Sequence, residues 1–274
     1  MTTRGVESIT DGFATVDRDF RYKFVNGEGA RILGRRVEEL LGKTVYEAFP
    51  ELKGTSFDQA IRRAIQQKKP QEAEEFFPPM NKWFSLRLFP APDGLSLYYR
   101  DVTERKLSEQ RLLLQYAVSR VLNAGKDLET TGTELLSAIG LSLSWRVGLM
   151  WTRDRDGGHL RCAHTYRAPN VFESEFIDVS CGTKLAPGQG LPGLVWEIAS
   201  PYWAMDFASD PRFPRAPIAA SEGLHAAFAF PILARGEVVG VIEFLNPDIR
   251  RPDADLLQTV TNIGRQVGQY FERH

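Results

Sequence analysis

The residues of this sequence that are able to do chemistry are two cysteines and a few histidines. Cys162 and Cys181 are not in CxxC spacing, and no cationic cluster beside either of them predicts a thiolate. We expect two free thiols in a reducing compartment, with oxidant sensing as the alternative. His164 and His225 are candidate haem ligands, although a single histidine is more often a hydrogen-bonded structural residue.

Motifs of the common enzyme classes are missing from the sequence. It has no Gly-x-x-x-x-Gly-Lys-Ser/Thr loop, no His-Glu-x-x-His zinc motif and no Gly-x-Ser-x-Gly nucleophile motif. The glycine-rich stretch 188–193 lacks the lysine of a phosphate-binding loop, so we interpret it as a structural turn. Catalysis by this chain is therefore unsupported, and whether the parent protein is an enzyme such as a histidine kinase stays open.

The composition is that of an ordinary globular protein. Hydrophobic residues make up 43% of the chain and charged residues 25%, the formal net charge is −1, and a length of 274 residues suits two domains. No block of Lys and Arg predicts nucleic-acid binding. No apolar run approaches the ~18 residues of a membrane span, and the N-terminus lacks an apolar signal segment. We expect a soluble, cytoplasmic protein.

Two segments of mixed pattern must position the chemistry-bearing residues. Residues 1–102 form the first and residues 127–274 the second, and both alternate strands with helices. In the first, strands are expected at 13–17, 21–25, 74–77, 83–89 and 95–100, with a helix capped by Ser56 before Pro70. In the second, strands are expected at 147–151, 160–166, 226–232 and 238–244. We predict the α+β class, with a central antiparallel sheet flanked by helices in each domain.

Residues 103–126 are charged and helical and join the two domains. Asp101 and Thr103 are favourable N-cap residues, and Glu104 stands three positions after Asp101, the spacing of a capping box. Apolar residues recur in heptads along this helix and along the final helix, which predicts a coiled-coil dimer. The predicted dimer seam is Leu107, Leu114, Val118, Val121, Leu256, Val260, Ile263, Val267 and Tyr270. The alternative is that each helix packs on its own domain.

The first segment resembles the PAS domain family. The resemblance rests on Asp11-Gly12-Phe13, the stretches 34–42 and 81–84, and above all Arg100-Asp101-Val102-Thr103-Glu104-Arg105-Lys106. It implies that Asp101, Thr103 and Glu104 couple the sheet to the exit helix. The candidate pocket residues, which core packing explains equally well, are Phe24, Phe57, Phe76, Trp83 and Leu86. Because no histidine precedes His159 and no cysteine precedes Cys162, we expect neither an axial-histidine haem nor a cysteine–flavin adduct here.

The second segment resembles the GAF domain family over nearly its whole length. The matching motifs are 188–193, 210–213, 223–232 and 240–244, followed by the final helix. Candidate pocket residues, again explained equally well by packing, are Trp151, His164, Trp196, Trp203, Asp206 and His225. Leu224 precedes His225 where bilin-binding members carry a cysteine, so covalent bilin attachment is not expected. The cofactor, if there is one, is unknown.

A PAS domain, a charged helix and a GAF domain in series resemble the input half of bacterial multi-sensor histidine kinases. The resemblance implies the sensory and dimerisation region of a two-component signal-transduction protein whose catalytic part is absent from this chain. Its expected partners are a second copy, a small-molecule ligand and a downstream kinase or other output domain. One alternative is a ligand-free scaffold that only dimerises or binds a protein. The other is a sensor whose GAF domain holds haem or another small cofactor.

Overall fold

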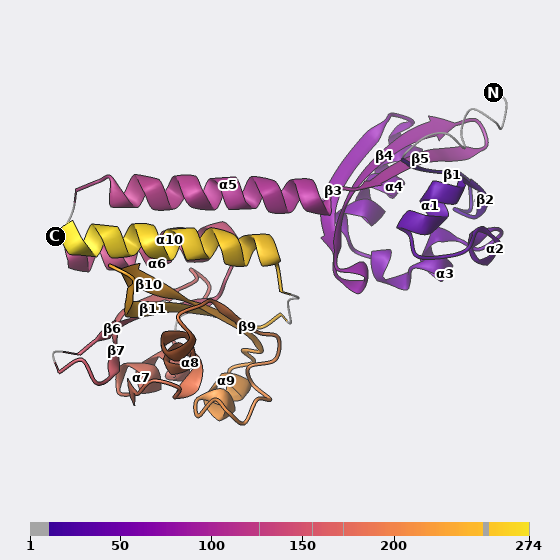
Figure 1. The fold of residues 1–274 in the computed structure, drawn as a ribbon. Helices are drawn as coiled ribbons and strands as arrows, with labels where there is room; N and C mark the ends of the chain where they lie inside the picture. Colours follow the sequence, from indigo (N-terminus) through magenta and orange to yellow (C-terminus); the bar gives the residue numbers. More distant parts are fainter. Residues whose placement is uncertain (1–10, 126, 155, 172, 249–251, 274) are drawn as a thin grey trace. The chain divides into compact units, whose positions relative to one another are not determined.

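The computed structural model describes residues 11–125, 127–154, 156–171, 173–248 and 252–273 (Figure 1). The chain forms two compact units, Met1–Ser108 and Glu109–His274, each with its own antiparallel sheet and helices. The long helix α5 (Thr103–Leu122) begins in the first unit and continues in the second. The predicted α+β architecture of two sheet-and-helix domains joined by a long helix is confirmed. None of the described helices is both long and apolar enough to cross a membrane.

The first unit is built on a five-stranded sheet with the strand order β2-β1-β5-β4-β3. Its strands are β1 (Gly12–Asp17), β2 (Tyr22–Val25), β3 (Gln71–Phe77), β4 (Lys82–Ala91) and β5 (Gly94–Asp101). Between β2 and β3 the chain forms α1 (Gly27–Ile32), α2 (Val37–Leu40), α3 (Val45–Ala48), η2 (Pro50–Leu52) and α4 (Ser56–Gln67), and η3 (Pro78–Met80) precedes β4. All neighbouring strands in this sheet are antiparallel.

Alternating side chains place the core of the first unit on one face of its sheet. In β5, for example, Leu95, Leu97 and Tyr99 are buried while the residues between them are less so. The helix α4 covers this face with apolar residues spaced along one side, as the sequence predicted. Its cap differs from the prediction, because Thr55 rather than Ser56 accepts the hydrogen bond from the Asp58 N–H group.

The second unit is built on a six-stranded sheet with the strand order β8-β7-β6-β11-β10-β9. Its strands are β6 (Val147–Arg153), β7 (Leu160–Arg167), β8 (Lys184–Leu185), β9 (Tyr202–Ala204), β10 (Ala226–Ala234) and β11 (Glu237–Asn246). Its other helices are α6 (Leu128–Leu143), α7 (Glu175–Cys181), α8 (Gly190–Ile198), α9 (Ala216–Ser221) and α10 (Ala254–Arg273). Figure 1 shows α6 and α10 on one face of this sheet, and α7 and α8 on the other.

Most heptad residues of α5 and α10 are buried within this chain, which leaves them little free surface for the predicted dimer seam. Eight of the nine are at most 7% exposed, and all of these except Tyr270 belong to the core between helices and sheet in the second unit. They are Leu114, Val118, Val121, Leu256, Val260, Ile263, Val267 and Tyr270. The ninth, Leu107, is half-buried in the first unit. An amphipathic stripe looks the same whether a second chain or the protein's own sheet covers it, and here the sheet does.

Two glycines let α10 approach β10 very closely. A Cβ atom added to Gly264 would lie 2.0 Å from the carbonyl oxygen of Pro231, and one added to Gly268 would lie 1.9 Å from that of Leu233. Both distances are far shorter than any non-bonded contact allows. The helix backbone therefore packs directly on the strand backbone at these two positions.

Candidate functional site

The hydroxyl group of Thr103 links the start of α5 to two strands of the first unit. Its Oγ1 accepts a hydrogen bond from the backbone N–H of Trp83 at 2.9 Å and donates one to Oδ1 of Asp101 at 2.6 Å. The same carboxylate accepts the backbone N–H of Thr103 at 3.0 Å. This one hydroxyl group thus joins Trp83 of β4 and Asp101, the last residue of β5, to the first residue of α5.

Charged side chains tighten this junction. Lys82 lies 2.8 Å from Oδ2 of Asp101, and Glu74 on β3 pairs with both Arg105 and Lys106 in the first turn of α5. Partial burial opposes the charged form of Asp101, but the hydrogen bonds from Lys82 and Thr103 outweigh it and lower the pKa of this carboxyl. Three strands therefore contribute to holding the base of the helix.

The sequence predicted coupling roles for Asp101, Thr103 and Glu104, and the structure joins the first two of them. Asp101 does not act as the N-cap itself, because the helix begins at Thr103, two residues later. Among the described residues no hydrogen bond to Glu104 completes a capping box. The local prediction was right in placing the start of the helix within this stretch, and Asp101 accepts the first N–H group of the helix from two residues before it.

A small apolar cavity lies inside the first unit, beside the same strands. Its volume is about 70 Å³, well below the ~300 Å³ of the smallest pockets for drug-sized ligands. Residues that line it from α4, β4 and β5 include Phe57, Ile61, Phe84, Leu86, Leu97 and Tyr99. The hydroxyl group of Tyr99 is buried and has no hydrogen-bond partner among the described residues. Burial raises the pKa of this hydroxyl far above its usual range.

Two of the five predicted pocket residues of this unit, Phe57 and Leu86, line the cavity. Phe76 and Trp83 pack on each other with ring centres 5.8 Å apart, outside the cavity lining. Their neighbours Phe77 and Phe84 line it instead, because successive strand residues point to opposite faces.

The fifth predicted residue, Phe24, also lies outside the cavity lining. Its ring packs on that of Phe13 at 6.0 Å, and the Phe13 ring in turn contacts Tyr98 at 4.8 Å. These rings form part of a half-buried aromatic group on the β1, β2 and β5 strands. Aromatic character alone did not reveal which face of the sheet each residue occupies.

In the second unit, a buried ion pair occupies the interior beneath α7 and α9. Arg215 donates to both carboxylate oxygens of Glu243, at 2.6 and 2.9 Å, and the two side chains are 4% and 0% exposed. The indole N–H of Trp151 donates to the same carboxylate at 3.0 Å, and Ser180 accepts from Arg215 at 2.8 Å. The guanidinium group also lies 4.9 Å from the ring centre of Phe176. Every charge here is paired, as burial requires.

Sequence reasoning missed this ion pair, although one signal was present. Glu243 is the only charged residue in the apolar run 238–245 of β11. A charge at the centre of a strand that is buried on both faces demands a cation nearby. The sequence could not show that Arg215, in the loop before α9, supplies it.

The structure does not gather the six predicted pocket residues of the second unit into one pocket. Trp151 faces the ion pair, whereas the ring of Trp203 stacks on Phe228 at 5.5 Å in the core on the opposite face of the sheet. His164 packs against α6 and lies 3.3 Å from the hydroxyl of Thr133. Burial lowers the pKa of His164.

The remaining three residues lie elsewhere in the unit. His225 and Asp206 approach each other to 3.6 Å, and Trp196 on α8 stacks beneath the guanidinium of Arg153 at 5.4 Å. No group of three or more His, Cys, Asp or Glu residues in the described part of the chain is placed to hold a metal ion. His164 and His225 have different neighbours and therefore do not form one set of ligands.

Family comparisons agree with this architecture. A family model described as the PAS fold matches residues 6–107, and one described as the GAF domain matches residues 125–272, more than half of the chain. The chain belongs to the GAF domain family. A PAS domain precedes its GAF domain, and we use these names for the first and second units from here on.

Solved structures resemble the GAF domain at low sequence identity. The GAF domain of a phosphoenolpyruvate-protein phosphotransferase from Coxiella burnetii is 17% identical with a TM-score of 0.52, over 61% of this chain and 95% of that one. The nlh2 GAF domain of A. aeolicus in an inactive state is 22% identical with a TM-score of 0.49, over 61% and 98%. Free methionine-R-sulfoxide reductase from Neisseria meningitidis, in complex with its substrate, is 16% identical with a TM-score of 0.49, over 61% and 90%. No curated protein matches the chain.

We expect the hydroxyl group of Thr103, and not its methyl group, to stabilise the junction between the PAS sheet and α5. Thr103→Val keeps the shape of the side chain but leaves the N–H of Trp83 unpaired, so we expect a loss of about 1–3 kcal/mol in the stability of the PAS domain. Thr103→Ser keeps the hydroxyl and should lose less than about 1 kcal/mol. Amide hydrogen exchange at Trp83 measures the difference. Equal protection in the two variants would contradict the assignment.

Removing one member of the buried ion pair should destabilise the GAF domain strongly. Glu243→Gln leaves the guanidinium of Arg215 buried without a counter-charge, and we expect a loss of about 3–5 kcal/mol in denaturant unfolding. The double variant Arg215→Met with Glu243→Leu removes both charges and should recover most of that loss. A double variant as unstable as the single one would show that packing around the pair, and not its charge balance, is what matters.

Proposed function

We propose that this chain is the sensory input region of a bacterial signalling protein, in which a small apolar molecule in the PAS cavity changes the hold of the PAS sheet on α5. We further propose a cytoplasmic sensor histidine kinase, with its catalytic part outside this chain, as the parent protein. The PAS domain followed by a GAF domain supports a signalling input region. The division into residues 1–102, 103–126 and 127–274 is part of the same proposal.

One observation carries this proposal, namely that the strands lining the cavity are also the strands that hold the exit helix. Phe84 and Leu86 of β4 line the cavity, and Trp83 of β4 donates its N–H to Thr103. Likewise Tyr99 lines the cavity, and Asp101, two residues further along β5, binds the same threonine. A ligand that shifts β4 relative to β5 therefore acts directly on the junction. Such a shift requires that the ligand bind one arrangement better than the other.

The size of the cavity can be tested with xenon, which enters dry apolar cavities in proteins. We expect xenon to bind the full chain and to change the chemical shifts of β4, β5 and the first turn of α5. Leu97→Phe fills the cavity and should weaken xenon binding at least tenfold, whereas Tyr98→Phe, at the neighbouring position of the same strand, should not. Circular dichroism checks that both variants fold.

Two results would count against the cavity as the ligand site. Xenon binding of equal strength in Leu97→Phe and in the unmodified chain would place the binding site elsewhere. No xenon binding at all, together with no ligand in native mass spectrometry or the absorption spectrum of the purified protein, would favour a ligand-free scaffold.

We also propose that the protein forms a homodimer through the outer face of α5. Leu112, Leu113 and Tyr116 are 66%, 64% and 70% exposed and form an apolar stripe. Glu109 and Arg120, both exposed, flank it on the same side of the helix. When two copies of α5 pair in antiparallel fashion, Glu109 of one copy faces Arg120 of the other, so the charges are complementary. This surface replaces the buried seam that the heptads predicted.

Charged substitutions on the stripe should weaken the dimer without unfolding the GAF domain. We expect Tyr116→Asp to raise the dissociation constant at least tenfold in a light-scattering dilution series, because it places a charge in an apolar contact. Gln269→Asp, on the exposed side of α10, is the matched control and should leave the constant unchanged. Leu114→Asp should instead unfold the GAF domain, since Leu114 is fully buried. A monomer at every concentration would refute the homodimer.

A further inference from the structure

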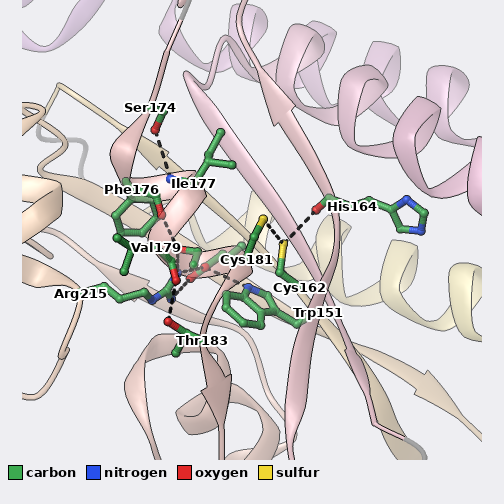
Figure 2. Close-up of polar contacts among 12 residues, drawn as sticks. Trp151, Cys162, His164, Ser174, Phe176, Ile177, Val179, Cys181, Thr183 and Arg215 are labelled. Atoms are coloured by element: carbon green, nitrogen blue, oxygen red, sulfur yellow. Dashed lines mark hydrogen bonds and ion pairs between the residues drawn. The ribbon is translucent and has the colours of Figure 1, made fainter.

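The two cysteines of the chain meet on the α7 side of the GAF sheet, although they are far apart in the sequence. Cys162 belongs to β7 and Cys181 is the last residue of α7. Their sulfur atoms lie 3.4 Å apart, and both thiols are free (Figure 2). Cys181 is exposed, whereas Cys162 is half-buried and points its thiol toward the carbonyl oxygen of His164 at 3.7 Å. The pair is therefore reachable from solvent through one of its members.

We propose that Cys162 and Cys181 form a dithiol that hydrogen peroxide oxidises reversibly to a disulfide within the chain. The sulfur atoms of a disulfide are ~2.05 Å apart, so these two have to approach by about 1.4 Å. Rotation of the exposed Cys181 side chain and a small movement of the end of α7 can supply this. The proposal does not depend on the ligand cavity of the PAS domain.

The reaction takes two steps. The exposed Cys181 thiolate attacks one oxygen of hydrogen peroxide, so that a sulfur–oxygen bond forms, the oxygen–oxygen bond breaks, and the departing hydroxide takes up a proton to become water. The Cys162 sulfur then attacks the sulfenic acid sulfur of Cys181. The disulfide bond forms, the sulfur–oxygen bond breaks, and the thiol proton leaves with the second water. Two thiols and one peroxide thus give one disulfide and two waters.

The surroundings assign the two roles. Burial raises the pKa of the Cys162 thiol strongly, which keeps it protonated and slow to react with peroxide itself. Cys181 is the sulfur that peroxide reaches from solvent. Cys162 is then close enough to resolve the sulfenic acid before further oxidation. A reducing compartment returns the disulfide to thiols by exchange with small thiols.

Oxidation would act on the buried ion pair through two direct neighbours. Ser180, adjacent to Cys181, accepts a hydrogen bond from Arg215 at 2.8 Å and donates one to the carbonyl oxygen of Phe176 at 2.6 Å. Trp151, the partner of Cys162 across β6 and β7, donates to Glu243. Drawing the end of α7 toward β7 therefore changes the surroundings of Arg215. The dithiol gives the GAF domain an input of its own.

Mass spectrometry of the peroxide-treated full chain tests the proposal. We expect the loss of two hydrogen atoms per chain and of both titratable thiols, at a rate independent of protein concentration. Trypsin should release residues 162–167 linked to residues 168–184, and dithiothreitol should separate them. A disulfide found only between chains, or none at all, would overturn the proposal.

Single variants test the order of the steps. In Cys162→Ser, the Cys181 sulfenic acid should persist and be trapped by dimedone, whereas in Cys181→Ser the remaining Cys162 should stay reduced under the same treatment. Both substitutions are small, and circular dichroism confirms folding. If Cys162 reacts as fast in Cys181→Ser as the pair does in the unmodified chain, the two cysteines oxidise independently and the dithiol is refuted.

Discussion

The hydroxyl group of Thr103 is the contact on which the junction between the PAS sheet and α5 depends. It is donor to β5 and acceptor from β4 at the same time, and it belongs to the first residue of the helix. A hydroxyl can fill both roles because it carries one hydrogen and two lone pairs. Further along the same helix, Leu114, Val118 and Val121 are core residues of the GAF domain. The first residue of α5 thus binds β4 and β5 of the PAS sheet, and its later turns form part of the GAF core.

The two domains use their interiors differently. The PAS domain leaves a small apolar space beside β4 and β5, whereas the GAF domain places the Arg215–Glu243 pair where its sheet faces α7 and α9. A buried ion pair is costly to assemble and costly to disturb, so it favours one arrangement of the surrounding residues. Small shifts of α7 or α9 are therefore opposed, because they disturb the contacts of this ion pair. The PAS cavity is therefore the better candidate for a ligand site. The Cys162–Cys181 pair of the GAF domain is the better candidate for a covalent modification.

Local patterns in the sequence predicted the elements well and the sites less well. Strand alternation and the start of α5 near Asp101 could both be predicted from neighbouring residues. Pocket residues could not, because Phe76 and Phe77, or Trp83 and Phe84, differ only in the face to which they point. The heptads of α10 gave the buried side of the helix but not the sheet that covers it. The partners of distant contacts could not be predicted locally, because the lone charge of Glu243 in its apolar strand pointed to a buried cation but not to Arg215, and nothing near Cys162 pointed to Cys181.

The glycines of α10 limit what kind of motion the C-terminal helix can make. At Gly264 and Gly268 the helix rests on carbonyl oxygens of β10 with no side chain between them. Rolling the helix about its own axis would bring the Cβ atom of a neighbouring residue, such as Ile263 or Val267, against the strand backbone. This close contact with β10 therefore opposes a rotation of α10 about its own axis.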